Sequence, residues 1–186
     1  MLVRTDEQMR IWNELMINEH PQGVGPLVGR QLRYLISSAY GWLGGFGFAS
    51  AALQLTDRDQ WIGWDAEQRQ KHLHLVINMS RFLIRPNIHC KNLASKVLSM
   101  SLLRLQDDFK QKYGYKPLLV ESFVDDSFYS GTCYQAANWI EIGKTKGRGR
   151  QDRFNRSPLT VKSIYVYSFK HDFRTQMGLS LNAGQG

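Results

Sequence analysis

The sequence predicts an α/β fold: a mixed β-sheet with helices on both faces and one parallel βαβ unit. Its 186 residues suffice for one well-buried core, and a hydrophobic content of 42% is typical of a folded domain. A strand-like run at residues 73–84, a long amphipathic helix and a second strand at residues 117–124 predict the βαβ unit. Short turns join the remaining strands, which we therefore expect to be antiparallel.

Apolar residues at helical spacing predict two main helices. The first runs from Asp6 to Ile17 after a Thr5–Asp6 start. The second runs from about Lys91 to Tyr113, and Gly114 is expected to end it. Shorter helices are expected at residues 66–73 and 131–139.

Alternating or continuous apolar runs predict four further strands, at residues 30–38, 42–53, 140–145 and 163–169. After the strand at residues 42–53 we expect a tight, aromatic-rich connection at residues 57–64.

The chain organisation follows from these elements. We expect an N-terminal helix and loop at residues 1–27, a single domain at 28–170 and a tail at 171–186, whose last residues, 178–186, have little reason to fold. The N-terminus lacks the apolar core of an export signal. The uncharged run from Ala39 to Leu55 is short for a bilayer and is broken by glycines. The expectation is a soluble, cytoplasmic protein without membrane contact.

Charge and cysteine content narrow the function classes. The net charge of +8 and a pI near 9.6 favour polyanionic partners, DNA or RNA above all. Cys90 and Cys133 are the only cysteines, and neither a CxxC pair nor a Cys/His cluster with zinc spacing is present. We therefore expect no metal.

Residues 81–105 pass from a strand through Pro86 and a polar elbow into the long helix. Such an elbow can hold a phosphate, because the first turn of a helix offers unpaired N–H groups, or it can be a plain turn. The element order resembles the GNAT N-acetyltransferase fold, in which an [RQ]-x-x-G-x-[GA] elbow grips the pyrophosphate of coenzyme A. The matching residues here are His89, Cys90, Lys91, Asn92, Leu93 and Ala94, followed by Ser95.

The GNAT resemblance implies acetyl-CoA or another acyl-CoA as cofactor, held by residues 89–95. Only Ala94 fits the motif outright, since His89 replaces Arg or Gln and Asn92 replaces the first glycine. After glycine, asparagine is the residue that best tolerates a positive φ, although its side chain occupies space beside a phosphate. His89 and Lys91 would add positive charge there.

Long aromatic-rich blocks between Val28 and Phe169 give a second resemblance. VGRQLRYLISSAYGWLGGFGFASAALQLTDRDQWIGW, NMSRFLIRPNIHCKNLASKVL, ESFVDDSFYSGTCYQAANWIEIGKTKGRGRQDR and KSIYVYSF are similar to the family of the Druantia anti-phage system protein DruA. Members of that family accompany phage-defence genes and also lie beside or fused to transposases. The resemblance implies a role in defence or in mobile elements, with other defence-system proteins or a transposase as partners.

Candidate catalytic residues lie around the strand at residues 117–124. Glu121, Asp125 and Asp126 are expected at or just beyond its end, where ligands gather in open α/β sheets, and Glu121 is the candidate general base. Asp125 and Asp126 are alternatively loop or N-cap residues.

The short helix at residues 131–139 supplies two further catalytic candidates. Cys133 and Tyr134 are expected in its first turn, where a helix N-terminus lowers a thiol pKa and a tyrosine can protonate a thiolate leaving group. The alternative for both is a buried position in a core helix.

The strongest electrostatic signal is NWIEIGKTKGRGRQDRFNR, residues 138–156. Its cations are opposed only by Glu141 and Asp152, and Gly147 and Gly149 make it pliable enough to follow a phosphate backbone. It is alternatively a solvated hairpin loop or a site for one small anion. The candidate nucleic-acid-binding residues are Lys144, Lys146, Arg148, Arg150, Arg153 and Arg156.

Trp61 and Trp64 can stack an exposed base or anchor a core, with Arg58 and Asp59 paired; we favour the core. Two functions remain. The first is a nucleic-acid-associated GNAT-like protein of anti-phage defence or mobile elements. The alternative is an acyl-CoA-dependent N-acyltransferase that modifies nucleic acid or a protein.

Overall fold

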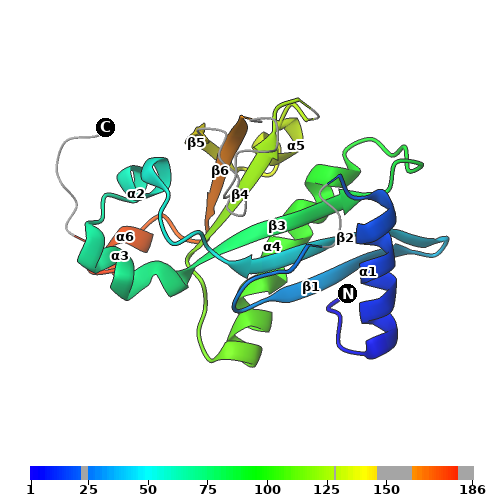
Figure 1. The fold of residues 1–186 in the computed structure, drawn as a ribbon, viewed down its shortest axis with the longest axis horizontal. Helices are drawn as coiled ribbons and strands as arrows, with labels where there is room; N and C mark the ends of the chain where they lie inside the picture. Colours follow the sequence, from blue (N-terminus) through cyan, green and yellow to red (C-terminus); the bar gives the residue numbers. More distant parts are fainter. Residues whose placement is uncertain (22–24, 128, 146–160, 180–186) are drawn as a thin grey trace. The chain divides into compact units, whose positions relative to one another are not determined.

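The computed structural model describes residues 1–21, 25–127, 129–145 and 161–179. The chain forms two compact units (Figure 1). Unit 1 comprises Met1–Ser50 and Ile77–Lys116, and unit 2 comprises Ala51–Val76 and Pro117–Gly186.

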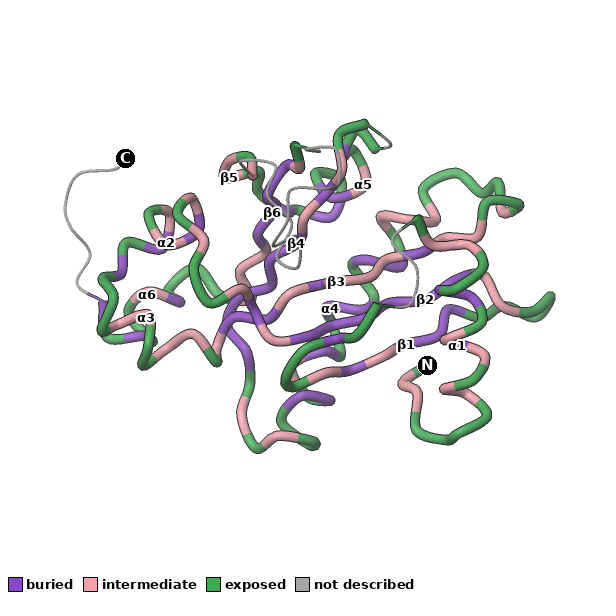
Figure 2. Tube along the Cα trace, in the orientation of Figure 1, coloured by how far each residue is buried: buried purple, intermediate pink, exposed green. Residues whose placement is uncertain are grey.

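Unit 1 is built on three antiparallel strands. They are β1 (Leu32–Ser38), β2 (Gly41–Ser50) and β3 (Val76–Ile84), with β1 paired to β2 and β2 to β3. β2 lies between the other two and is buried from Gly44 to Ala49, a run visible in Figure 2. Its glycines leave room for the packed helices, since a Cβ on Gly45 would come within 3.2 Å of Trp12.

Helix α1 (Asp6–Glu19) covers one face of this sheet (Figure 1). Thr5 and Gln8 form a capping box, in which each side chain bonds the other residue's backbone N–H. Trp12 inserts between the helix and the strands, where its Nε1–H donates to the Phe46 carbonyl at 2.9 Å. The predicted helix is confirmed and is two residues longer than expected.

Helix α4 (Leu93–Tyr113) lies on the opposite face. Leu35 of β1 packs into the cluster that contains Trp12, whereas the neighbouring Tyr34 donates its hydroxyl to Asp108 of α4 at 2.8 Å. Successive strand residues point to opposite faces, so helices cover both sides of this sheet. Gly114 ends α4 with a φ of 84°, as predicted.

Unit 2 contains a second antiparallel ladder. β6 (Lys162–Ser168) lies between β4 (Leu119–Asp125) and β5 (Ile140–Lys144), and both pairings are antiparallel. The first four residues of β4 are fully enclosed, from Leu119 to Ser122. β3, α4 and β4 follow one another along the chain in the strand–helix–strand order predicted for the βαβ unit.

Short helices complete unit 2. They are α2 (Thr56–Ile62), α3 (Ala66–His72), the 3-10 turn η1 (Leu73–Leu75), α5 (Thr132–Gln135) and α6 (Phe173–Gln176). They enclose a core in which residues of α2 and α6 meet β4 and β6, among them Ile62, Leu119, Val166 and Phe173.

Two expectations are corrected in unit 2. Residues 57–64 are not a tight connection, because α2 occupies most of them and ends at Gly63 with a φ of 84°. The segment 178–186, which has little reason to fold by its sequence, begins with a folded residue, since Leu179 is buried in the same core as Phe173 and Met177. Trp61 stacks on Phe173 at 5.3 Å between ring centroids, which ties α6 to α2.

In the residues that the structure describes, none of the helices has the length and apolar character needed to cross a membrane.

Candidate functional site

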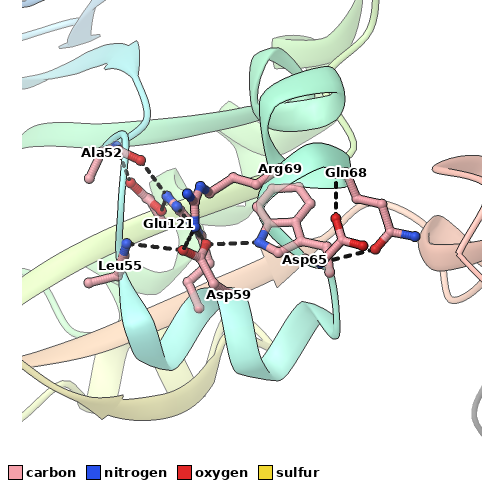
Figure 3. Close-up of polar contacts among 9 residues, drawn as sticks. Ala52, Leu55, Asp59, Asp65, Gln68, Arg69 and Glu121 are labelled. Carbon is pink, nitrogen blue, oxygen red and sulfur yellow. Dashed lines mark hydrogen bonds and ion pairs between the residues drawn. The ribbon is translucent and has the colours of Figure 1, made fainter.

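Glu121 is the third residue of β4 and is completely buried, so it does not lie at the strand end as expected. Its Oε2 accepts a hydrogen bond from Nη1 of Arg58 at 2.8 Å, and its Oε1 accepts one from the Ala52 N–H at 2.9 Å (Figure 3). Both carboxylate oxygens therefore have partners inside unit 2.

Arg58 of α2 is as enclosed as Glu121. Its Nη1 also donates to the Ala52 carbonyl at 2.8 Å, and its Nε and Nη2 form a fork on Oδ1 of Asp59 at 2.9 and 2.7 Å. The guanidinium lies 5.7 Å from the ring centroid of Trp64. One cation is thus shared between two carboxylates and a backbone carbonyl.

Asp59 connects this buried pair to the surface (Figure 3). Besides Arg58, it accepts hydrogen bonds from Nε1 of Trp64 at 2.9 Å, from the Leu55 N–H at 3.3 Å and from Nη1 of Arg69 at 3.2 Å. The pairing of Arg58 with Asp59 and the core position of Trp64 confirm the structural interpretation of residues 57–64.

The environment of Glu121 suits a structural ion pair. Burial raises the pKa of this carboxyl, while Arg58 and the Ala52 N–H oppose the rise. A general base must come within hydrogen-bond reach of the group it deprotonates. Because this carboxylate is enclosed with both oxygens engaged, the arrangement does not favour catalysis by Glu121, whose role as a base stays a prediction.

A pocket of about 390 Å³ borders the same network. Asp59, Trp64 and Arg69 line it together with the exposed side chains of Gln54 and Gln60. The accessible part of the network therefore consists of the Asp59–Arg69 pair and not of Glu121.

Cys133 and Tyr134 lie in the first turn of α5, as expected. The expected lowering of the thiol pKa is wrong, however: burial raises the pKa of Cys133. A helix of four residues has too few aligned peptide dipoles to offset that desolvation. Burial also raises the pKa of Tyr134, whose hydroxyl lies 3.1 Å from Oγ of Ser122.

A polar cluster on β5 and β6 escaped the sequence reasoning. Glu141 accepts hydrogen bonds from Oγ of Ser163 at 3.0 Å and from the Tyr165 hydroxyl at 3.2 Å. The register pairs Glu141 directly with Tyr165. The alternating segments IEIGK and SIYVYSF predict this contact once they are paired as antiparallel strands, because directly opposite residues then share one face.

Lys144 is the one candidate of the basic segment within the described residues. Its Nζ lies 2.8 Å from Oδ2 of Asp126, and this hydrogen bond lowers the pKa of Asp126 and raises that of Lys144. The other candidates, Lys146, Arg148, Arg150, Arg153 and Arg156, lie outside the described residues.

The elbow before α4 has the backbone that its motif predicts. Asn92 has a φ of 61° and a ψ of 7°, which confirms that asparagine takes the glycine position in the left-handed region. Its side chain forms no capping hydrogen bond. His89, Cys90 and Lys91 are exposed, so the elbow presents its cations to solvent.

Among the described residues, no group of three or more His, Cys, Asp or Glu side chains is arranged to hold a metal ion.

Comparison with known proteins gives one sequence family. The family model described as Druantia protein DruA matches residues 1–178. No curated protein matches the sequence.

Solved structures give the fold. A spermidine N-acetyltransferase SpeG chimera from Vibrio cholerae and hSSAT has a TM-score of 0.50 and 10% identity over 79% of this chain and 70% of that chain. A GNAT-family acetyltransferase from Streptococcus pneumoniae has a TM-score of 0.49 and 10% identity, covering 90% and 78%. Aminoglycoside acetyltransferase AAC(6')-Ib, solved with coenzyme A and kanamycin, has a TM-score of 0.49 and 14% identity, covering 78% and 71%.

The predicted fold class, a GNAT-like α/β fold, is confirmed by the likeness to the spermidine N-acetyltransferase chimera. At 10% identity this likeness concerns the fold alone.

Replacing Glu121 by glutamine is expected to destabilise the protein by about 3 kcal/mol, because Arg58 then keeps an incompletely compensated buried charge. Urea denaturation followed by tryptophan fluorescence measures the loss. Asp126→Asn, which breaks an exposed ion pair near the end of the same strand, should leave the midpoint almost unchanged. Equal midpoints for Glu121→Gln and the wild type would show that the pair does not support the fold.

Cys133 should react with iodoacetamide more slowly than the exposed Cys90 at pH 7 to 9, since a raised pKa leaves less thiolate at each pH. Peptide mass spectrometry over a time course gives both rates in one sample. In urea the two rates should converge. Faster labelling of Cys133 in the folded protein would restore the hypothesis of an activated thiol.

Proposed function

We propose that this chain, which belongs to the Druantia protein DruA family, acts in anti-phage defence by binding nucleic acid through basic segments on a GNAT-like fold. The family name supports the defence role. The binding role rests on the distribution of charge along the chain.

The basic segment at residues 144–156 is the observation that carries the proposal. It holds six Lys and Arg residues and one acidic residue, Asp152. Two glycines within it, Gly147 and Gly149, permit close approach of the backbone to phosphates. Charge of this density favours phosphate contacts, which supply most of the affinity in non-specific nucleic-acid binding.

A second basic region supports the same role. Residues 77–116 contain eight Lys and Arg against two Asp. Lys91, Lys96, Lys110 and Lys112 of this region are exposed. The two segments carry formal charges of +5 and +6, which exceed the net charge of +8 because the rest of the chain is acidic on balance. Such charge favours a polyanionic partner.

The buried Arg58–Glu121 pair also favours binding over catalysis. The strand carboxylate that the sequence offers as a general base is engaged by Arg58 and Ala52 in the folded protein. The site thus lacks an accessible base at that position, whereas electrostatic binding needs none.

The double variant Arg148→Ala/Arg150→Ala should bind a 20-base-pair duplex more weakly than the wild type. Removing two phosphate contacts should also reduce the slope of log K against log salt by about 2 units. Fluorescence anisotropy between 50 and 300 mM KCl measures both, and single-stranded DNA and RNA of the same sequence show which nucleic acid is preferred.

Arg10→Ala/Lys71→Ala is the matched control, because it removes two exposed positive charges outside both basic segments. It should keep the affinity and the salt slope of the wild type. The proposal fails if the wild type binds none of the three nucleic acids, or if binding does not respond to salt.

Acyl transfer from an acyl-CoA to a nucleic acid or a protein is a second candidate function. The exposed elbow favours it, because Asn92 holds the left-handed conformation beside Lys91 at the start of a 21-residue helix. In this candidate Cys133 and Tyr134 assist the transfer, although the pKa of each is raised by burial.

Asn92→Gly should tighten coenzyme A binding about fivefold, since removal of the side chain permits one more backbone hydrogen bond worth about 1 kcal/mol. Isothermal titration calorimetry with coenzyme A measures the change. Asn87→Gly makes the same substitution at an exposed elbow position outside the motif and should have no effect. Absence of binding in both the wild type and Asn92→Gly would remove the acyltransferase candidate.

A further inference from the structure

Unit 1 contains a pocket of about 440 Å³ that belongs to none of the sites described above. Three segments frame it: residues 2–9 at the N-terminal arm and the start of α1, residues 31–33 at the start of β1, and residues 108–112 near the end of α4. The elbow residues lie at the opposite end of α4, so the acyl-CoA motif is not part of this pocket.

Arg33 lines this pocket and lacks an acidic partner. Its guanidinium lies 5.1 Å from the ring centroid of Trp12, and burial lowers its pKa. Among the described residues it forms neither an ion pair nor a hydrogen bond from its buried Nε. A half-buried cation without a counterion is costly, so a function other than stability accounts for it best.

Gln31 provides a second unpartnered group in the same wall. Its Oε1 is buried, and no described residue donates to it. The backbone of Gln31 is fully engaged by contrast, because its N–H donates to the Tyr113 hydroxyl and its carbonyl accepts from Lys112 and Tyr113. Two residues of one pocket wall thus each contain a buried polar atom without a partner among the described residues.

The charges around the pocket are unbalanced. Arg4 and Lys112 also line it, and neither is ion-paired to a described carboxylate; their side chains donate to Gln111 and to the Gln31 carbonyl. The acidic lining residues are Asp6 and Asp108.

Asp108 contributes little free negative charge to the pocket. Arg104 binds it at 2.7 Å and Tyr34 donates to it at 2.8 Å. Burial acts to raise the pKa of Asp108, but these contacts outweigh it and lower that pKa. Three cations therefore face one uncommitted carboxylate, that of Asp6.

We infer that this pocket binds the phosphate group of a small phosphorylated molecule. Three cations from three different segments suit a dianion better than a single carboxylate does, and Arg33 offers donors in a planar fork. Leu2, Val3 and Met9 provide an apolar wall for the remainder of the molecule, and the volume is in the range of small-molecule sites.

The inference uses none of residues 144–156 and shares only Lys112 with the second basic region, so it does not depend on the proposed nucleic-acid function. Arg33→Met removes the charge together with its cation–π contact with Trp12. The ligand-free variant should be close to the wild type in stability, because the loss of that contact opposes the gain from removing a cation without a counterion.

Thermal unfolding with adenosine monophosphate, inorganic phosphate and adenosine tests the inference at constant ionic strength. The two phosphate compounds should raise the Tm of the wild type by roughly 4 °C at about ten times Kd, and adenosine should not. Arg33→Met should lose this rise, while Arg10→Ala and Arg148→Ala/Arg150→Ala should keep it.

Three results would overturn the inference: no rise with either phosphate compound, an equal rise with adenosine, or a rise that survives in Arg33→Met. A rise lost only in Arg148→Ala/Arg150→Ala would assign phosphate binding to the basic segment instead. Failure of nucleic-acid binding leaves the outcome of this experiment unaffected.

Discussion

The ion pair between Arg58 and Glu121 is the interaction on which unit 2 depends. Both groups are completely enclosed, and removing each charge from water costs several kcal/mol unless every donor and acceptor finds a partner. Ala52 satisfies that condition through both its N–H and its carbonyl, and Asp59 does so through a fork on the guanidinium. The start of α2 and the middle of β4, 63 residues apart in sequence, are thereby held in one geometry.

This constraint also limits what the fold can do. A GNAT-like fold does not by itself imply acyl transfer, because function resides in the groups that the fold presents. Here the strand carboxylate stabilises the interior, and burial keeps the α5 thiol protonated. What the described residues present instead is cationic: an exposed elbow before α4 and exposed lysines on that helix. These groups support the proposed binding of anions more directly than they support catalysis.

Sequence reasoning succeeded where the determining contacts are local. The Thr5 start of α1, the glycine that ends α4 and the left-handed Asn92 depend on residues within one helical turn. The partner of Glu121 was not predicted. A charged residue inside an apolar strand indicates that a buried partner exists, but the pattern does not identify that partner. Sequence reasoning also missed α2, whose seven residues are too few for a clear periodicity. The Cys133 pKa was misjudged because burial, which no local pattern reveals, outweighed the helix terminus.

The described Arg and Lys side chains differ in whether a carboxylate lies beside them, and this difference distinguishes cations that stabilise the fold from candidates for ligand binding. In unit 2, Arg58, Arg69 and Lys144 each lie within 3.2 Å of a carboxylate, and the buried Arg58–Glu121 pair ties α2 to β4. In unit 1, Arg33 has no such partner although it is more buried than Lys144. A half-buried guanidinium that contacts the Trp12 ring but no carboxylate stabilises the fold less than an ion-paired one does, because it loses hydration without gaining a counterion. The inferred phosphate ligand would provide the counterion that no described carboxylate supplies.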